Sequence, residues 1–260
     1  MSAARAERVD GPTGPLNVRT WDGPGTPVVL VHPINTDSSV WTAVAELLEG
    51  PVVALDLRGH GSSGLDGPYT VDGYVDDVLA AMDALGVAAA HLAGGSLGGT
   101  IGVALAARAP ERALSVTTFG STLGTGASDA DIQAMIDELE AKGTAAYFAD
   151  LAPLIVGTAY RDDARVLAGI RNAAGSRPEE VVAGILRGAF GADIRSVTGA
   201  VKVPVHAVGG TEDPTCPPAM TEEIAAATGG RITSLDGIGH VPMLEVPERV
   251  AQLITEQVST

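Results

Sequence analysis

The stretch that decides the fold is residues 89–99, which read AAHLAGGSLGG. Its first part, residues 89–93, is an apolar run that predicts a buried strand, and residues 97–109 predict the helix that follows. Between them, residues 94–98 have the form G-x-S-x-G, in which a sharp turn exposes the serine hydroxyl and needs glycines where backbones approach closely. We therefore predict Ser96 as a nucleophile. The alternative is a glycine-rich turn without chemistry.

Outside this stretch, short apolar runs alternate with amphipathic stretches, which is typical of a parallel sheet covered by helices. Further strands are predicted at 28–31, 52–55, 116–119, 205–208 and 232–235, with 16–21 as an antiparallel strand at the sheet edge. Further helices are predicted at 41–48, 71–85 and 219–227. Several of the strands are continuously apolar, as expected for strands buried on both faces.

The region from about 127 to 198 interrupts this alternation. It shows only helical patterns, at 132–139, 147–156, 164–170 and 179–190. We therefore predict a core of residues 1–123 and 201–260 and a helical cap, or lid, of residues 124–200. The alternative is a second helical layer packed on the core. Candidate apolar residues for the lining of a pocket under the cap are Met135, Tyr147, Phe148, Leu151, Leu154 and Phe190.

A serine hydroxyl needs a positioned base to take its proton. Among the five histidines, His91 and His206 lie in predicted strands, which favours core roles. His60 lies in a loop and is expected to shape that turn, whereas for His32, at the end of a strand, structural and functional roles are both open. His240 follows the last predicted strand, and the chain order Ser…acid…His that accompanies a G-x-S-x-G turn selects it as the base.

The candidate acids are Asp213 and Glu212, which both follow the predicted strand 205–208. Ligands and chemistry gather at the carboxyl ends of strands in open α/β sheets. A carboxylate there can bond the imidazole, fix its tautomer and stabilise the imidazolium. We predict Asp213, which a proline follows, and keep Glu212 as the alternative. Either carboxylate has a non-catalytic role open to it, as a turn residue that accepts backbone N–H groups.

Composition limits the partners. The net charge is −16, from 32 acidic and 16 basic residues, which disfavours nucleic acid and anionic membrane surfaces. No apolar run is long enough for a spanning helix, and the first residues lack the apolar core of a signal peptide. The single cysteine, Cys216, excludes an internal disulfide framework and fits a reducing compartment, so we expect a cytoplasmic protein.

Five segments in order resemble the α/β-hydrolase family over nearly the whole chain. They are residues 29–32 with Trp41, residues 56–63 (DLRGHGSS, similar to D-x-R-G-x-G-x-S), residues 91–99, residues 203–217, and residues 239–247 (GHVPMLEVP, similar to G-H-x-x-x-x-E-x-P). The resemblance implies an α/β-hydrolase fold, with a mostly parallel sheet flanked by helices and a helical lid inserted after strand 6. It implies Ser96, Asp213 and His240 as the catalytic triad, and the backbone N–H groups of Leu97 and Ile34 as the oxyanion hole.

The sequence departs from the family pattern at Pro33, where the family usually has glycine after the strand-ending histidine. Proline has no N–H and a fixed φ, so the implied oxyanion donor is the next amide, that of Ile34. Two roles are open for Asn35. Its side chain adds a donor to the site, or it holds the loop by bonding its own backbone.

These observations predict a serine hydrolase that cleaves a carboxylic ester or lactone through an acyl-enzyme, with no metal or organic cofactor. Residues 32–37 and the length of the lid look most like enol-lactonases and related small esterases. The alternatives are a C–C bond hydrolase or perhydrolase on the same triad, a lyase, or a slow-turnover ligand receptor. The expected partner is a small-molecule ester or lactone.

Overall fold

The computed structural model describes residues 4–174 and 177–260. Eight strands form one sheet in the order β1-β2-β4-β3-β5-β6-β7-β8, in which β3 to β8 are parallel to one another. The mostly parallel α/β architecture is therefore confirmed. The strands are β1 (Arg5–Gly11), β2 (Gly14–Trp21), β3 (Val28–Val31), β4 (Val52–Leu55), β5 (Ala90–Gly95), β6 (Ala113–Phe119), β7 (Val205–Gly210) and β8 (Arg231–Leu235).

One strand prediction needs correction. β2 is antiparallel to β4, as predicted, but it is not the edge of the sheet, because β1 pairs with its outer side. β1 reads RAERVDG and is mostly exposed, so it lacks the apolar pattern that marks a buried strand. Its pairing with β2 is fixed by a short connection rather than by burial.

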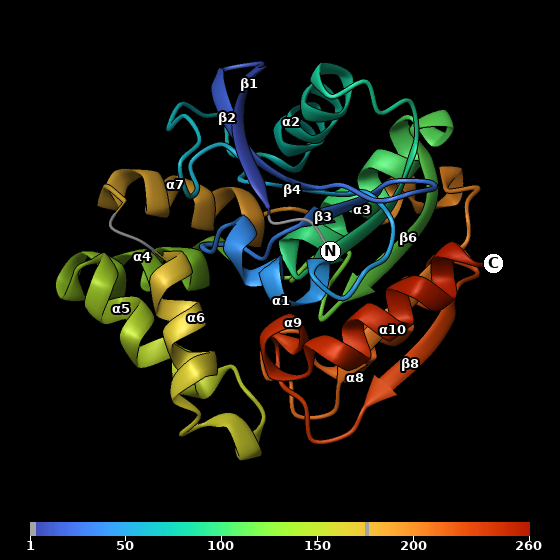
Figure 1. The fold of residues 1–260 in the computed structure, drawn as a ribbon. Coiled ribbons are helices and arrows are strands. Elements are labelled where there is room, and N and C mark those ends of the chain that lie inside the picture. The colour runs from blue at the N-terminus through green and yellow to red at the C-terminus, as the bar shows by residue number, and fades with distance from the viewer. Residues whose placement is uncertain (1–3, 175–176) are drawn as a thin grey trace.

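Helices cover both faces of the sheet (Figure 1). On one face, α2 (Val71–Ala84), α3 (Leu97–Arg108) and α8 (Pro218–Thr228) bury apolar side chains in a core with Val29 and Val31. On the other face, α1 (Thr42–Ala45) and α10 (Pro247–Val258) pack with Val28 and Leu30. Successive residues of β3 thus feed two different cores, as strand geometry requires. In the described part of the chain, no helix is both long enough and apolar enough to cross a membrane.

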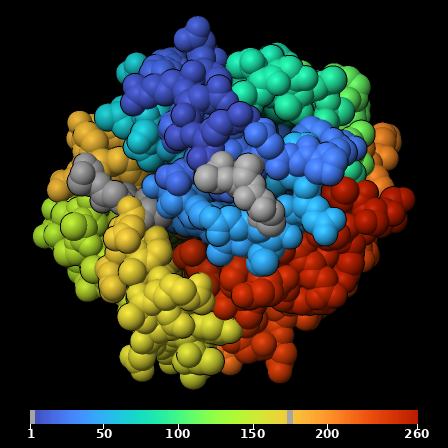
Figure 2. All heavy atoms as spheres, in the orientation of Figure 1, coloured from blue at the N-terminus to red at the C-terminus, as the bar shows by residue number. Residues whose placement is uncertain are grey.

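Between β6 and β7 the chain forms a run of helices, called here the helical insertion (residues 124–200). Its main helices are α4 (Asp129–Lys142), α5 (Thr144–Leu151), α6 (Ala164–Ala174) and α7 (Glu179–Phe190). They bury an apolar cluster of their own, which includes Ile136, Leu139 and Val182. In Figure 2 the yellow part of the insertion lies against the red C-terminal segment, and α6 contacts the short helix α9 (Pro242–Glu245) there.

A buried ion pair fixes the loop after β4. The Arg58 guanidinium donates to both carboxylate oxygens of Asp77 on α2, with the Nη2–Oδ1 distance at 2.7 Å. The backbone N–H of Arg58 also donates to Asp77, and its Nη2 donates to the carbonyl oxygen of Gly73. Because both charged side chains are almost completely buried, each depends on the other for its solvation.

Candidate active site

Ser96 lies at the turn between β5 and α3, with φ +50° and ψ −121°. This region is unfavourable for a residue with a side chain and costs on the order of 1–3 kcal/mol. The turn is held by the Ser96 N–H, which donates to the carbonyl oxygen of Phe119 at 2.8 Å, and by the Ser96 carbonyl, which accepts from Gly99 N. A Cβ on Gly98 would collide with the carbonyl oxygen of Val31, so only glycine fits there. The strained strand-to-helix turn predicted for residues 94–98 is present.

Asp213 and His240 form a buried hydrogen-bonded pair. Nδ1 of His240 lies 2.9 Å from Oδ2 and 3.0 Å from Oδ1 of Asp213. Oδ1 also accepts from the backbone N–H groups of Thr215 and Cys216, at 2.8 Å each, which fixes the carboxylate in place. Nδ1 therefore carries the proton that it donates to Asp213, and Nε2 is left as an acceptor.

Glu212, the alternative acid, lies apart from this pair. Its Oε2 accepts from the backbone N–H of Thr158 at 2.6 Å, and its side chain is exposed. That hydrogen bond holds the pKa of Glu212 below its usual value. Of the two carboxylates, the structure thus brings Asp213 to His240 and uses Glu212 to bind the helical insertion.

The Ser96 hydroxyl is not bonded to His240 in this structure. Within residues 4–174 and 177–260, no hydrogen bond joins the two side chains. Catalytic hydrogen bonds are often long before a substrate binds and shorten in the complex. Ser96 and His240 line adjoining cavities that share Ile34, Phe190 and Thr215.

Two backbone N–H groups beside Ser96 are free to bind an anion. The N–H of Leu97 is at the first position of α3, and that of Ile34 lies in the loop after β3. In the part of the chain that the structure describes, neither donates to any other group. Both residues line the same small pocket as Ser96, which has a volume of about 40 Å³. The two residues implied as an oxyanion hole are thus together at the serine.

Two buried histidines hold the Ile34 loop. His60 accepts the N–H of Asn35 on Nε2 at 3.1 Å, while its Nδ1 lies 2.9 Å from the carbonyl oxygen of Arg58. His32 has its Nδ1 2.7 Å from the carbonyl oxygen of Pro33, and its Nε2 accepts from Leu57 N. Burial lowers the pKa of both imidazoles, that of His60 well below its usual value. Both histidines are therefore neutral supports of the loop.

Glu245 clamps the loop that carries His240. Its carboxylate accepts the backbone N–H groups of Gly239 at 2.9 Å and Val241 at 3.2 Å, the residues on either side of His240. It also accepts the N–H of Gly157 from the helical insertion, at 3.0 Å. Burial raises the pKa of Glu245, and the three donors act against that rise. Glu245 belongs to the motif at residues 239–247, but the sequence alone predicted no role for it.

A cavity of about 330 Å³ lies where the helical insertion meets the loops after β3, β7 and β8. Its lining is largely apolar and comes from the insertion and from the loops after β3, β7 and β8: Pro33, Ile34, Asn35, Thr36, Met135, Tyr147, Phe148, Leu151, Ile155, Ile170, Leu186, Phe190, Thr215, His240 and Val241. Five of the six predicted lining residues are confirmed. The prediction for Leu154 is wrong, because this side chain is 64% exposed to solvent.

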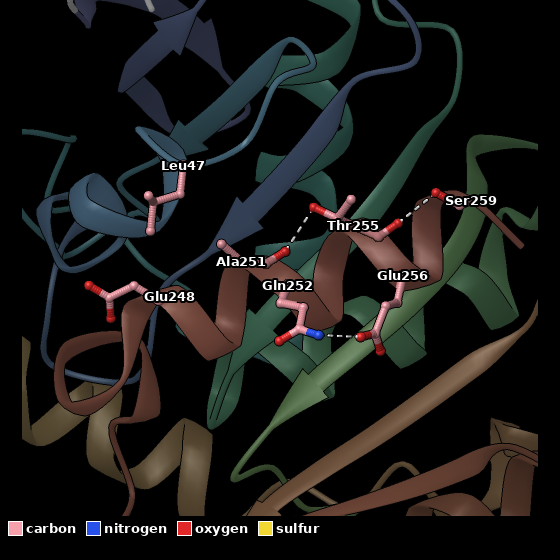
Figure 3. A pocket seen from close by; sticks show the side chains of 7 residues that line it. All are labelled: Leu47, Glu248, Ala251, Gln252, Thr255, Glu256 and Ser259. Carbon is pink, nitrogen blue, oxygen red and sulfur yellow. Dashed lines mark hydrogen bonds between the residues drawn. The ribbon is translucent and has the colours of Figure 1, made fainter.

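A second concavity lies on the outer surface along α10 (Figure 3). It is formed by Leu47 and one face of the helix, where Gln252 donates to Glu256. The described lining residues include neither histidine nor cysteine. This surface therefore offers no imidazole as a base, and none of its lining residues belongs to the two cavities at Ser96 and His240.

The remaining two histidines have roles within the sheet. His91 on β5 has its Nδ1 2.8 Å from the hydroxyl of Ser115, and His206 on β7 has its Nε2 2.8 Å from the hydroxyl of Thr233. Burial lowers the pKa of both side chains. The core roles predicted for them agree with these contacts.

Comparisons with known proteins identify the family of the chain. Residues 28–253 match the model of the alpha/beta hydrolase family. The chain is 28% identical over 260 residues to strigolactone esterase D14 of Arabidopsis thaliana, covering 92% of this chain and 94% of that protein. It is 24% identical over 250 residues to the karrikin insensitive 2 receptor CA of Petunia hybrida, covering 89% and 91%. The enol-lactonase from Burkholderia xenovorans LB400 superposes with a TM-score of 0.89 at 29% identity, over 98% of this chain and 100% of that one. The chain is a hydrolase of the alpha/beta hydrolase family.

Proposed function

We propose that this protein hydrolyses a carboxylic ester or lactone through an acyl-enzyme on Ser96. The observation that carries the proposal is that the N–H groups of Leu97 and Ile34 have no partner in the described chain and belong to residues that line the same pocket as Ser96. Donors that are already oriented towards the place where negative charge develops are the largest single contribution to acyl transfer in many enzymes.

In the proposed mechanism, Ser96 Oγ attacks the carbonyl carbon while Nε2 of His240 takes its proton. Asp213 holds the imidazole and stabilises its charged form. The oxyanion accepts from Leu97 and Ile34, and one such donor is worth on the order of 3 kcal/mol. His240 then gives the proton to the departing alcohol. Water, deprotonated by His240, attacks the acyl carbon and releases the acid and the free serine.

We assign the helical insertion as a cap over this site, since its residues supply much of the lining of the larger cavity. The core would then comprise residues 1–123 and 201–260. The net charge of −16 supports a small-molecule partner rather than nucleic acid or an anionic membrane, and the single cysteine supports a cytoplasmic location.

The test is covalent labelling with a fluorophosphonate, read by intact mass and peptide mapping, followed by a panel of short esters and lactones. We expect one adduct on Ser96, none in Ser96→Ala, and a greatly slowed reaction in His240→Ala. An adduct on another residue, or none in the unaltered chain, would reject Ser96 as an activated nucleophile.

A second candidate function is ligand reception with slow turnover at the same site. It is supported by the largely apolar cavity at His240 and by the relative whose name describes a receptor. The same ester panel distinguishes the two. Many turnovers per minute favour the hydrolase, whereas a single rapid acylation followed by negligible release favours the receptor.

A further inference from the structure

The described residues that line the larger cavity carry no carboxylate, ammonium or guanidinium group, and most of the cavity's surface comes from aliphatic and aromatic side chains. A charged group of a ligand would lose its hydration there without gaining a counter-charge, which is strongly unfavourable. A lactone formed from a dicarboxylate, with one carboxylate still free, would therefore fit poorly. An uncharged group would fit well.

Asn35 is the exception to the apolar lining. It is only 3% exposed, and among the described residues its Oδ1 has no hydrogen-bond partner. Among the described residues that line this cavity, it alone has a buried, unpaired polar side-chain atom. Buried polar groups in proteins are nearly always paired, so an unpaired carboxamide on a residue that lines a cavity indicates that a ligand completes its bonding.

The backbone of Asn35 holds the loop through two hydrogen bonds. Its N–H donates to His60, its carbonyl oxygen accepts from Nη2 of Arg177 at 3.2 Å, and its φ is +57°. Asparagine tolerates this left-handed conformation better than most residues. The side chain makes no hydrogen bond to its own backbone in the described structure. Of the two roles left open by the sequence, loop support thus belongs to the backbone, and the side chain is available to a ligand.

The position of Asn35 separates it from the oxyanion. Asn35 lines the larger cavity, with His240, but not the small pocket that contains Ser96 and Leu97. Its neighbour Ile34 lines both. Asn35 is therefore placed to contact the part of a substrate that lies in the larger cavity, whereas the developing oxyanion would lie in the adjoining small pocket.

We propose that Asn35 is a specificity residue that selects an uncharged, largely apolar ester or lactone with one further hydroxyl or carbonyl group, bound by its carboxamide. This inference rests on the proposed function, because the same site must hold the scissile carbonyl. Either polar group suits the residue, since a carboxamide both donates and accepts.

The experiment compares esters of equal chain length in which one carbon carries a hydroxyl, an oxo group, a carboxylate or no substituent. One set varies the acyl part and another the alcohol part. The key variant is Asn35→Gly, because glycine adopts φ +57° without strain and removes only the side chain. Thr215→Val is the matched control, since it removes a different polar group, a hydroxyl, from the same lining and keeps the backbone N–H that binds Asp213. Binding of the same esters to Ser96→Ala and to the Ser96→Ala/Asn35→Gly double variant, by calorimetry, measures the preference without turnover.

We expect the unaltered chain to favour the hydroxyl or oxo ester over its unsubstituted partner by about tenfold in kcat/KM in at least one set, the effect of one hydrogen bond. Asn35→Gly should reduce that ratio to near one, Thr215→Val should preserve it, and the carboxylate ester should be the poorest substrate. The same ratios are expected for binding to Ser96→Ala and its double variant.

Three results would overturn the inference: equal treatment of all members by the unaltered chain, a preference for the carboxylate, or an equal loss for every ester in Asn35→Gly. The last would place Asn35 in the oxyanion hole or in loop support. Failure of the proposed function is recognised separately, because Ser96 would then not take the fluorophosphonate, while the calorimetry still tests Asn35.

Discussion

Replacing Glu245 tests how the structure holds His240, the proposed base. Oε2 accepts the N–H groups of Gly157 and Gly239, and Oε1 accepts that of Val241. In Glu245→Gln the carbonyl can keep the first two bonds, but the NH₂ group then faces the N–H of Val241. One bond to a charged acceptor is lost and a buried donor is left unpaired, so we expect a loss of about 2–3 kcal/mol in the free energy of unfolding. In Glu245→Ala all three donors lose their acceptor, and the expected loss is about 4 kcal/mol.

The assay is urea unfolding followed by circular dichroism, together with the rate of fluorophosphonate labelling under conditions where each variant is folded. Glu140→Gln is the control, since Glu140 is exposed on α4 and should change stability by no more than about 0.5 kcal/mol. Because two of the three donors flank His240, labelling should also slow in Glu245→Gln. An unchanged free energy of unfolding in Glu245→Gln would refute the claim that the Glu245 carboxylate holds this loop. Lower stability with unchanged labelling would refute its role in placing His240, and would leave that role to the bond from His240 N to the carbonyl oxygen of Ile155.

Three further outcomes follow from other contacts. Asp213→Asn should lower kcat by about 10⁴-fold while Glu212→Gln stays near the unaltered rate in the same ester assay, and the reverse order would move the acid to Glu212. Asp77→Asn should lower the free energy of unfolding by about 3–5 kcal/mol in urea, since Arg58 would keep a buried charge without its partner. Burial, helped by a neighbouring arginine, lowers the pKa of His206 to about 4. In the unfolded chain His206 binds a proton near pH 6.5, whereas in the folded chain it binds one only near pH 4. The free energy of unfolding therefore falls as the pH drops from about 6.5 to about 4. His206→Gln should make the decrease in Tm between pH 7 and pH 5 smaller, and an unchanged decrease would contradict this assignment.

The sequence predicted elements whose residues bury apolar side chains. β3 and β4 are buried along their whole length, and their predicted bounds are confirmed. β1 was not predicted, because an exposed edge strand is held by backbone pairing and its sequence therefore has no apolar pattern. α10 was also not predicted, although it buries Val250, Leu253 and Ile254 at helical spacing, a signal that a search for 3.6-residue periodicity would have found.

In the candidate site, too, the residues with a local sequence motif were predicted and the long-range contacts were not. The turn at Ser96 and the loop at His240 have local motifs, so both were predicted. The clamp by Glu245 depends on a hydrogen bond to Gly157, 88 residues away in the chain, and no local pattern reports such a contact. The wrong prediction for Leu154 has a related cause. Periodicity identifies an apolar helix face, but it does not show where the helix ends, and Leu154 lies in a short 3-10 turn with its side chain in solvent.

The loop after β3 shows how the chain accommodates proline where the family usually has glycine. Pro33 has no N–H to lose, and its carbonyl oxygen accepts from the hydroxyl of Thr36 at 2.8 Å and lies 2.7 Å from Nδ1 of His32. The positive φ of this loop is at Asn35, whose N–H is bound by His60. The N–H of Ile34 is thereby left free between two fixed residues, beside the serine. Since donors that are already fixed need no reorganisation when the oxyanion forms, proline at this position is compatible with a working oxyanion hole and makes its loop stiffer.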